Sequence, residues 1–397
     1  MNRRTVLKNC RVIGREEITE NIDILTEDGE IADLGKFDVP ENAEVYDVKG
    51  NYISSGFVDI HTHGGAGADF MDATDSAFDT IMKYHLENGV TDVVATSLTA
   101  SMDDIEKFLE CARTYMKKPQ KYARMAGVHL EGPFLSLKGC GAQNPEYLMN
   151  PGHSNYGFII ENCDIIKTVT ISPELDADGK MTHELSKNGI LVSGGHDDGV
   201  YPEFMPAIRS GMRHLTHIYR AMSGIGTRKD IRDIGLREYG LLDDTLTCEM
   251  IADNVHITPQ LAQFILKCKG AERTAVVSDS LRCAGMPADG RLYTMGPKDD
   301  KNSLTVRVAD GIAVLAGGSR FAGSITSVHK MVKNLIAAGI KVTDAFKTGT
   351  STPARIIGEK KTGSVEKGFY ANLCELNSNF DIVSVYSKGE RVINNEN

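Results

Sequence analysis

Positive charge and long apolar segments are both scarce in this sequence, which argues against two classes of partner. Its 44 lysines and arginines are outnumbered by 54 aspartates and glutamates, and the formal net charge is −10. An acidic chain is not expected to bind nucleic acid or an acidic membrane surface, although a local basic pocket could still hold a phosphate. No run approaches the roughly 18 apolar residues that a membrane helix requires. The basic start, residues 1–9, is followed by no apolar run, so we expect no signal peptide.

Paired cysteine motifs are absent as well. The eight cysteines show neither a Cys-X-X-Cys pair nor the spacing of a disulfide framework. A chain of 397 residues, 41% of them hydrophobic, can bury a large core and has no need of disulfides. We therefore expect reduced thiols and a cytoplasmic protein.

The two ends of the chain have the pattern of short strands joined by turns. Apolar and polar positions alternate over residues 1–55, and Asp28-Gly29 between two such runs is typical of a β-hairpin. Residues 358–397 have the same character. The simplest interpretation is one small β-sandwich domain built from residues 1–55 and 358–397. Two separate flaps are the alternative.

Between the ends, strand-like runs alternate with helical patterns, which is typical of βα units and a parallel sheet. Eight units predict an α/β fold, a (β/α)8 TIM-type barrel over residues 56–357. An open doubly wound sheet is the alternative, but no Gly-X-Gly-X-X-Gly motif follows the first strand. Helical patterns stand at 76–88, 102–116 and 259–269. The expected strands are 57–63, 92–97, 125–131, 166–172, 190–196, 213–217, 247–251 and 274–279.

Histidines and carboxylates stand at the carboxyl ends of these expected strands. Residues i and i+2 of a strand point the same way, so His61 and His63 project side by side. All strand ends share one face of a barrel, where active sites are built. Imidazole and carboxylate ligands predict a divalent transition metal, zinc or iron, with one or two ions per subunit. The later strands three, five, six and eight end in Glu131, His196, His217 and Asp279.

His129 needs a separate interpretation, because it lies two residues before Glu131 and points the same way. It would lie one layer deeper in the barrel. We expect a buried hydrogen-bonding residue there and not a metal ligand.

Eight segments in order along the chain match motifs of one known family. His-Leu-Glu-Gly-Pro-Phe at 129–134 is specific, whereas His-Thr-His at 61–63 is shared more widely. The segments are 56–65, 127–134, 195–196, 216–222, 251–256, 278–279, 322–324 and 352–355. On these motifs the sequence resembles the N-acetylglucosamine-6-phosphate deacetylases of the amidohydrolase superfamily.

The resemblance implies a barrel plus a small β-sandwich from both termini, and it implies roles for the polar residues. His61 and His63 would hold a second metal, as in the members that keep both histidines. Asp279 matches the catalytic carboxylate, which would take a proton from water and pass it to the leaving amine. The main metal would be bound by Glu131, His196 and His217.

The implied sugar-phosphate contacts are less regular. His256 and the backbone of Arg220 and Ala221 match positions that contact the sugar phosphate, and Arg228 lies near the family's phosphate arginine. Arg220 stands where the family has asparagine, and its guanidinium would suit a phosphate. Alternatively, Arg220 turns away and pairs with an acid such as Asp233 or Glu238.

The acetyl group would also meet an altered residue. The family's histidine that contacts the acetyl carbonyl is Gln143 here, which can donate a hydrogen bond but cannot carry a charge. His153, in the next loop, could replace it. The segment 227–244 departs from the family's usual sequence too, so the metal chemistry is better supported than the choice of sugar.

These features predict an enzyme that removes the acetyl group from N-acetylglucosamine 6-phosphate, a small-molecule substrate. We expect a homodimer. One alternative is a deacetylase of another N-acyl amino sugar phosphate, such as N-acetylgalactosamine 6-phosphate. Others are an amidohydrolase acting on a cyclic amide or a dipeptide, and a noncatalytic regulator that binds a sugar phosphate.

Overall fold

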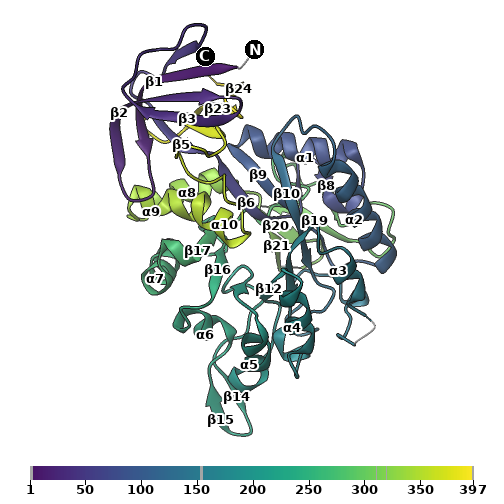
Figure 1. The fold of residues 1–397 in the computed structure, drawn as a ribbon. Coiled ribbons are helices and arrows are strands. Elements are labelled where there is room, and N and C mark those ends of the chain that lie inside the picture. Colours follow the sequence, from purple (N-terminus) through teal and green to yellow (C-terminus); the bar gives the residue numbers. More distant parts are fainter. Residues whose placement is uncertain (1–2, 153–154, 310, 319, 396–397) are drawn as a thin grey trace.

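An eight-stranded parallel sheet forms the centre of the molecule (Figure 1). The computed structural model describes residues 3–152, 155–309, 311–318 and 320–395. The strands pair in their order along the chain, and all pairs are parallel. They are β6 (Phe57–Thr62), β9 (Val90–Thr96), β10 (Arg124–Glu131), β11 (Ile166–Ile171), β12 (Leu191–Gly194), β13 (His214–Leu215), β16 (Thr247–Met250) and β17 (Thr274–Val276).

The first and last strands of this sheet approach each other, so the barrel is nearly closed. The segment after β17 bonds to the end of β6: Asp279 N donates to His61 O at 2.9 Å, and His63 N donates to Ser280 O at 2.9 Å. A doubly wound sheet has two separated edges, so that alternative is wrong. The predicted TIM-type barrel is confirmed.

Helices cover the outside of the barrel, and β9 is accordingly buried along its whole length. The predicted helices 102–116 and 259–269 match α2 and α7, which begin after the N-cap residues Ser101 and Thr258. The α-helices are α1 (Asp75–Glu87), α2 (Met102–Met116), α3 (Gly157–Glu161), α4 (Lys180–Lys187), α5 (Tyr201–Ser210), α6 (Leu236–Leu242), α7 (Pro259–Lys269), α8 (Val328–Ala337), α9 (Val342–Gly349) and α10 (Ser351–Ile356). Short 3-10 turns are η1 (Phe70–Asp72), η2 (Pro145–Tyr147), η3 (Pro173–Leu175) and η4 (Ala271–Arg273).

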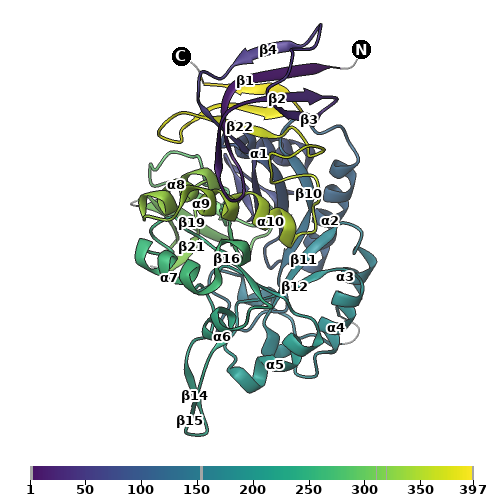
Figure 2. The same ribbon diagram turned by 60° about the vertical axis from the view of Figure 1, so that its left-hand side comes forward.

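Both ends of the chain contribute strands to one mixed sheet, which contains parallel and antiparallel pairs. Both termini lie at the same end of the molecule (Figure 2). The two ends meet where Ser55 pairs with Leu373. One face of this sheet buries its own apolar cluster, which includes Leu7, Ile53 and Tyr386. A shared β domain is therefore confirmed and two separate flaps are excluded. Its strands are β1 (Arg4–Ile13), β2 (Ile18–Glu27), β3 (Glu30–Gly35), β4 (Glu44–Asp47), β5 (Tyr52–Ser55), β22 (Leu373–Leu376), β23 (Ile382–Ser387) and β24 (Glu390–Asn394).

Three smaller antiparallel sheets are added to the barrel, and they were not expected from the sequence. The hairpin of β14 and β15 projects from the body (Figure 2). A four-stranded sheet between β17 and α8 ends in β21, whose neighbour Ser324 donates its backbone N–H to Asp279 O at 2.8 Å. No helix in the described ranges is long and apolar enough to cross a membrane. The strands are β7 (Gly64–Gly65), β8 (Ala68–Asp69), β14 (Gly226–Arg228), β15 (Ile231–Asp233), β18 (Leu292–Met295), β19 (Leu304–Ala309), β20 (Ile312–Leu315) and β21 (Phe321–Gly323).

Candidate active site

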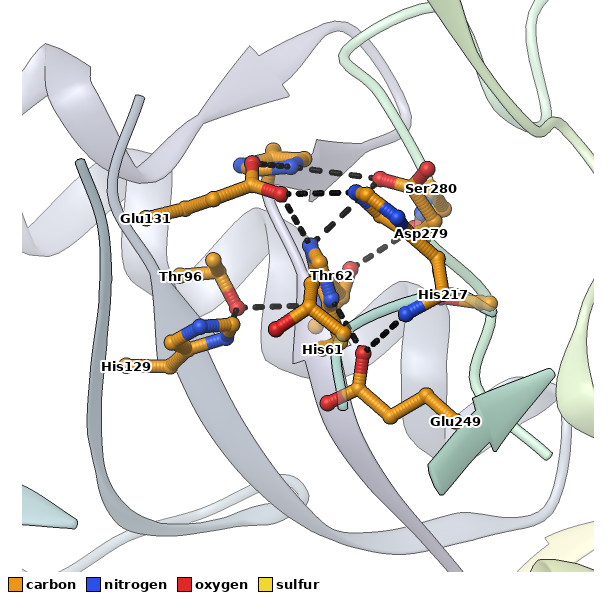
Figure 3. Close-up of polar contacts among 12 residues, drawn as sticks. His61, Thr62, Thr96, His129, Glu131, His217, Glu249, Asp279 and Ser280 are labelled. Atoms are coloured by element: carbon orange, nitrogen blue, oxygen red, sulfur yellow. Dashed lines mark hydrogen bonds and ion pairs between the residues drawn. The ribbon is translucent and has the colours of Figure 1, made fainter. Parts of the chain in front are cut away.

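Glu131 is the centre of a cluster of imidazoles at the carboxyl end of the barrel strands (Figure 3). Its Oε1 atom lies 3.0 Å from His217 Nε2 and 3.1 Å from His196 Nε2. His196 donates from Nδ1 to the carbonyl of Gly139 at 3.0 Å, which leaves Nε2 as its ligand nitrogen. Glu131 Oε2 lies 3.3 Å from His63 Nε2. The structure thus brings together the three residues expected to hold the main metal.

Asp279 joins the same cluster from the other side of the barrel seam. Its Oδ1 atom lies 3.2 Å from His63 Nε2 and 3.6 Å from His61 Nε2. His61 Nε2 is also 3.5 Å from Glu131 Oε1. All six residues predicted at strand ends therefore meet at one place.

Four of these six residues lie just beyond the strands in which they were expected: His63 lies one position after β6, and the other three lie two or three positions after theirs. The expected strands ran to His196, His217 and Asp279, but β12, β13 and β17 stop earlier. The three residues have φ angles of 50°, 30° and 44°, in the left-handed region that ends strand pairing. Left-handed non-glycine residues are unfavourable on their own and concentrate at functional sites. Here they turn the side chains inward, across the mouth of the barrel.

The cluster has the electrostatics of a cation site. Burial would raise the pKa of Glu131, but the nearby His61 and His196 hold it well below its usual range. Burial likewise opposes ionisation of Asp279, but the hydrogen bond with His63 and the nearby imidazoles of His61 and His217 together outweigh it, so the pKa of Asp279 is also lowered. Burial would lower the pKa of His63, but Asp279 and Glu131 raise it to about 9. Two buried carboxylates thus stay ionised and attract positive charge.

The donor atoms also fit a divalent transition metal. Buried side-chain nitrogens without a hydrogen-bond partner include His61 Nε2. The Nε2 atoms of His196 and His217 lie 3.0 Å apart and face the same carboxylate oxygen, an arrangement suited to sharing one ion. Two groups of mutually close ligand atoms contain the six residues: Glu131, His196 and His217, and His61, His63 and Asp279.

His129 has the role expected of it. Its Nε2 lies 2.7 Å from the Thr170 hydroxyl, and burial lowers its pKa to about 3, so the ring is neutral. Its ligand atom is close to those of His61 and Glu249, but it is held by threonines on the wall of the barrel.

A cavity of about 390 Å³ opens above the cluster. Its walls include the metal-ligand candidates and most of the residues expected to contact substrate. The lining residues beyond the cluster are Gly141, Ala142, Gln143, Arg220, Ala221, His256, Met295, Arg320, Phe321, Ala322 and Gly323.

Gln143 is held in one orientation beside Glu131. Its Oε1 accepts a hydrogen bond from Thr99 N at 2.8 Å, and its Nε2 donates to Glu131 Oε2. One N–H of the amide remains for a ligand in the cavity. His153, the proposed substitute for the family histidine, lies outside the described residues.

Arg220 faces the cavity, and its pairing with Asp233 is excluded. Its guanidinium carbon lies 4.9 Å from the centre of the Phe321 ring, and its Nε is buried without a hydrogen-bond partner. Its one hydrogen bond among the described residues, to Val255 O, is long at 3.4 Å. Asp233 instead accepts from the backbone of Ile234. Arg220 therefore offers charge and unused donors to a ligand.

His256 lies near the same aromatic ring. The centres of the His256 and Phe321 rings are 5.3 Å apart. His256 Nδ1 pairs with Asp253 Oδ2 at 2.7 Å, which leaves Nε2 as the nitrogen available to a ligand.

Arg228 is the one described candidate that the structure does not bring to the cavity of its own chain. It lies in β14 on the projecting hairpin and bonds to Asp198 O at 2.6 Å and to Glu203 Oε1 at 3.2 Å. Arg228 therefore does not line this cavity, because the inserted hairpin carries it away from the barrel mouth, and its contact with a substrate stays a prediction.

Two residues of the site were missed by sequence reasoning. Glu249 is buried and bonds to His61, and its signal was a charged residue inside the apolar run 247–251. Phe321 supplies the ring that Arg220 and His256 both approach. It directly precedes the matched segment 322–324, but nothing in its neighbourhood indicated what it would contact.

Comparisons with known proteins agree with this geometry. The model of the Amidohydrolase family matches residues 52–392. N-acetylglucosamine-6-phosphate deacetylase of Haemophilus influenzae is 28% identical over 388 residues, covering 97% of this chain and 98% of that protein. N-acetylgalactosamine-6-phosphate deacetylase of Escherichia coli O157:H7 is 26% identical and covers 97% and 98%. The crystal structure of N-acetylglucosamine-6-phosphate deacetylase from Pasteurella multocida has a TM-score of 0.89 at 25% identity, covering 98% of this chain and 100% of that one.

Proposed function

Because this chain belongs to the amidohydrolase family, we propose that it hydrolyses the acetamide of N-acetylglucosamine 6-phosphate to acetate and glucosamine 6-phosphate. The observation that carries the proposal is one cavity with two unlike walls. Imidazoles and ionised carboxylates lie at its base, and the guanidinium of Arg220 lies with His256 at its side. The groups at the base can activate an amide and a water molecule, and the groups at the side can bind a phosphate.

We propose that one or two divalent ions, zinc or iron, are held by these imidazoles and carboxylates. A metal bound there would polarise the acetamide carbonyl and lower the pKa of a water molecule. Glu131, His196 and His217 would hold the main ion, and His61 and His63 a second.

Asp279 is proposed to move the proton. Its lowered pKa keeps it ionised at neutral pH, so it can accept a proton from the water that attacks the carbonyl carbon. When the carbon–nitrogen bond breaks, the same carboxyl group returns that proton to the leaving nitrogen. Gln143 can donate its remaining N–H to the developing oxyanion.

A panel of substrates tests this proposal. We expect zinc- or iron-loaded enzyme to release acetate from N-acetylglucosamine 6-phosphate with a far higher kcat/KM than from N-acetylglucosamine. Removal of the metal with a chelator should abolish the release. No acetate from any amino sugar phosphate would favour a noncatalytic regulator, and activity that is indifferent to phosphate would favour a cyclic amide or a dipeptide.

N-acetylgalactosamine 6-phosphate is the second candidate substrate, and it belongs in the same panel. The similarity to the E. coli relative supports it, because that protein is named for this sugar. The departures at Gln143 and Arg220 also support it, because both residues line the cavity in which we propose that the sugar binds. The ratio of kcat/KM for the two epimers decides between them.

We further propose a cytoplasmic homodimer with the domain division 1–55 plus 358–397 and 56–357. All eight cysteines are free thiols, which supports the compartment. Ile225 and Ile231 of the projecting hairpin region are 60% and 67% exposed, which supports packing of a second copy there. Light scattering on the wild type and on Ile231→Asp tests the dimer, which should dissociate in the variant.

A further inference from the structure

Glu249 on β16 is a carboxylate below the metal-ligand candidates whose role the proposed reaction leaves unassigned. Its side chain is only 1% exposed, yet it makes three contacts through its two oxygens, of which Figure 3 shows the two to His61 and His217. Oε2 accepts from His61 Nδ1 at 2.8 Å and from the backbone N–H of His217 at 3.1 Å. Oε1 lies 3.2 Å from His214 Nε2.

We propose that Glu249 is a positioning residue that holds His61 as a metal ligand and so builds the second metal site. This inference rests on the proposed metal site, not on the identity of the sugar. An imidazole that donates from Nδ1 to a carboxylate has its lone pair on Nε2. That Nε2 atom is buried without a hydrogen-bond partner and points at Glu131 and Asp279.

The same oxygen also fixes the distance between the two ligand groups. Glu249 Oε2 bonds the side chain of His61, which belongs to one group, and the backbone of His217, which belongs to the other. His217 has a φ angle of 30°, so this bond supports a backbone conformation that is unfavourable alone. One carboxylate thus links β6 to the turn after β13 directly beneath both sites.

The alternative is an ordinary buried ion pair between Glu249 and His214 that serves only stability. Such a pair explains why Glu249 Oε1 lies near His214, but it does not explain why Oε2 is directed at His61 and His217. The two interpretations differ in what each variant does to metal binding. A loosened core would weaken both sites equally, whereas loss of the contact to His61 weakens mainly the site that His61 belongs to.

Four variants separate these interpretations. Glu249→Gln keeps an oxygen for His61 and His217 but removes the charge, and Glu249→Ala removes the contact altogether. His61→Ala is the reference for loss of the second ligand group. His214→Gln is the matched control, because it disturbs the other side of the same carboxylate without touching His61.

The experiment titrates the metal-free proteins with Zn²⁺ against a chromophoric chelator, with elemental analysis of the loaded proteins and calorimetric Tm values. We expect two Zn²⁺ ions in the wild type and in His214→Gln. Glu249→Gln should bind one of them about 10- to 100-fold more weakly, as removal of such outer carboxylates does elsewhere. Glu249→Ala should lose the same ion as His61→Ala, and it should bind the remaining ion somewhat more weakly because it also loses the bond to the His217 backbone.

Three results would overturn the proposal. The first is a single Zn²⁺ site in the wild type. The second is unchanged affinity at both sites in Glu249→Ala. The third is equal weakening of both sites in Glu249→Gln and His214→Gln with a parallel fall in Tm. Acetate release by the wild type is measured separately, so failure of the deacetylase proposal is distinguishable from failure of this one.

Discussion

The base and the side of the cavity come from different kinds of structure. At the base, the metal floor consists of residues that lie on barrel strands or directly follow them: Glu131, His61, His63, His196, His217 and Asp279. At the side, the sugar rim consists of residues from loops and from the added strand β21: Gln143, Arg220, Ala221, His256 and Phe321. The floor residues are all less than 9% exposed, whereas Arg220 is half-buried with unused donors.

The contrast separates the residues proposed to carry out the reaction, in the floor, from those proposed to select the substrate, in the rim. The floor side chains contact one another and are held by the barrel strands and the turns that follow them, so their arrangement is determined before any substrate arrives. The rim offers donors that only a ligand can use. We therefore expect changes in the floor to act on metal content and kcat, and changes in the rim to act on KM and on the choice of sugar.

The largest effect should come from removing the carboxylate that the whole floor shares. Glu131→Ala should lose both metals and all measurable acetate release, because Glu131 contacts ligands of both groups. Elemental analysis and the acetate assay provide the measurement. Glu375→Ala, which removes a buried glutamate of the terminal sheet, is the control and should keep metal and turnover. Two ions retained in Glu131→Ala would contradict the shared role.

Asp279→Asn should lower kcat by about 10²- to 10⁴-fold while the metal content stays near normal. Asparagine fills the same volume but cannot exchange a proton. Steady-state kinetics and elemental analysis on one preparation measure both quantities. Asp253→Asn is the matched control, since that carboxylate orients His256 at the rim and its loss should raise KM more than it lowers kcat. Near wild-type turnover in Asp279→Asn would remove this residue from the mechanism.

A smaller effect is expected from the rim, and it should depend on phosphate. Arg220→Asn should raise KM for the phosphorylated sugar by about 10- to 150-fold, the worth of one charge-assisted hydrogen bond of roughly 1.5–3 kcal/mol. The unphosphorylated sugar should be unaffected. Arg237→Asn is the control, because Arg237 also stacks on a ring, that of Tyr219, but does not line the cavity. Equal effects of Arg220→Asn on both sugars would show that Arg220 does not contact the phosphate.

The smallest effect should come from the residue that touches both regions. Gln143→Leu removes one neutral donor and should lower kcat about 2- to 12-fold, in line with roughly 0.5–1.5 kcal/mol per hydrogen bond. Gln143→His restores a donor and should recover most of the rate. Indifference of kcat to both substitutions would place the oxyanion contact elsewhere.

Much of the floor was predictable because its signals are local. Apolar runs alternating with helical patterns predicted the eight strands, and a polar residue at the end of such a run predicted each of the six floor positions. The terminal sheet was predictable for the same reason, since period-two alternation persists at both chain ends. Strand ends were less accurate, because the left-handed turns at His196, His217 and Asp279 end the pairing early.

The sequence by itself therefore determined the barrel, the β domain and the set of candidate metal-binding side chains, because each depends on periodicity and on which face a residue occupies. Only the tertiary structure decided the rest. It placed Arg220 over Phe321, a hundred residues further along the chain, and carried Arg228 away on a projecting hairpin. It also brought the carboxylate of Glu249 on β16 into contact with the imidazole of His61 on β6. These contacts depend on sheet register and on the path of inserted loops, which are set by long-range packing and leave no periodic trace in the sequence.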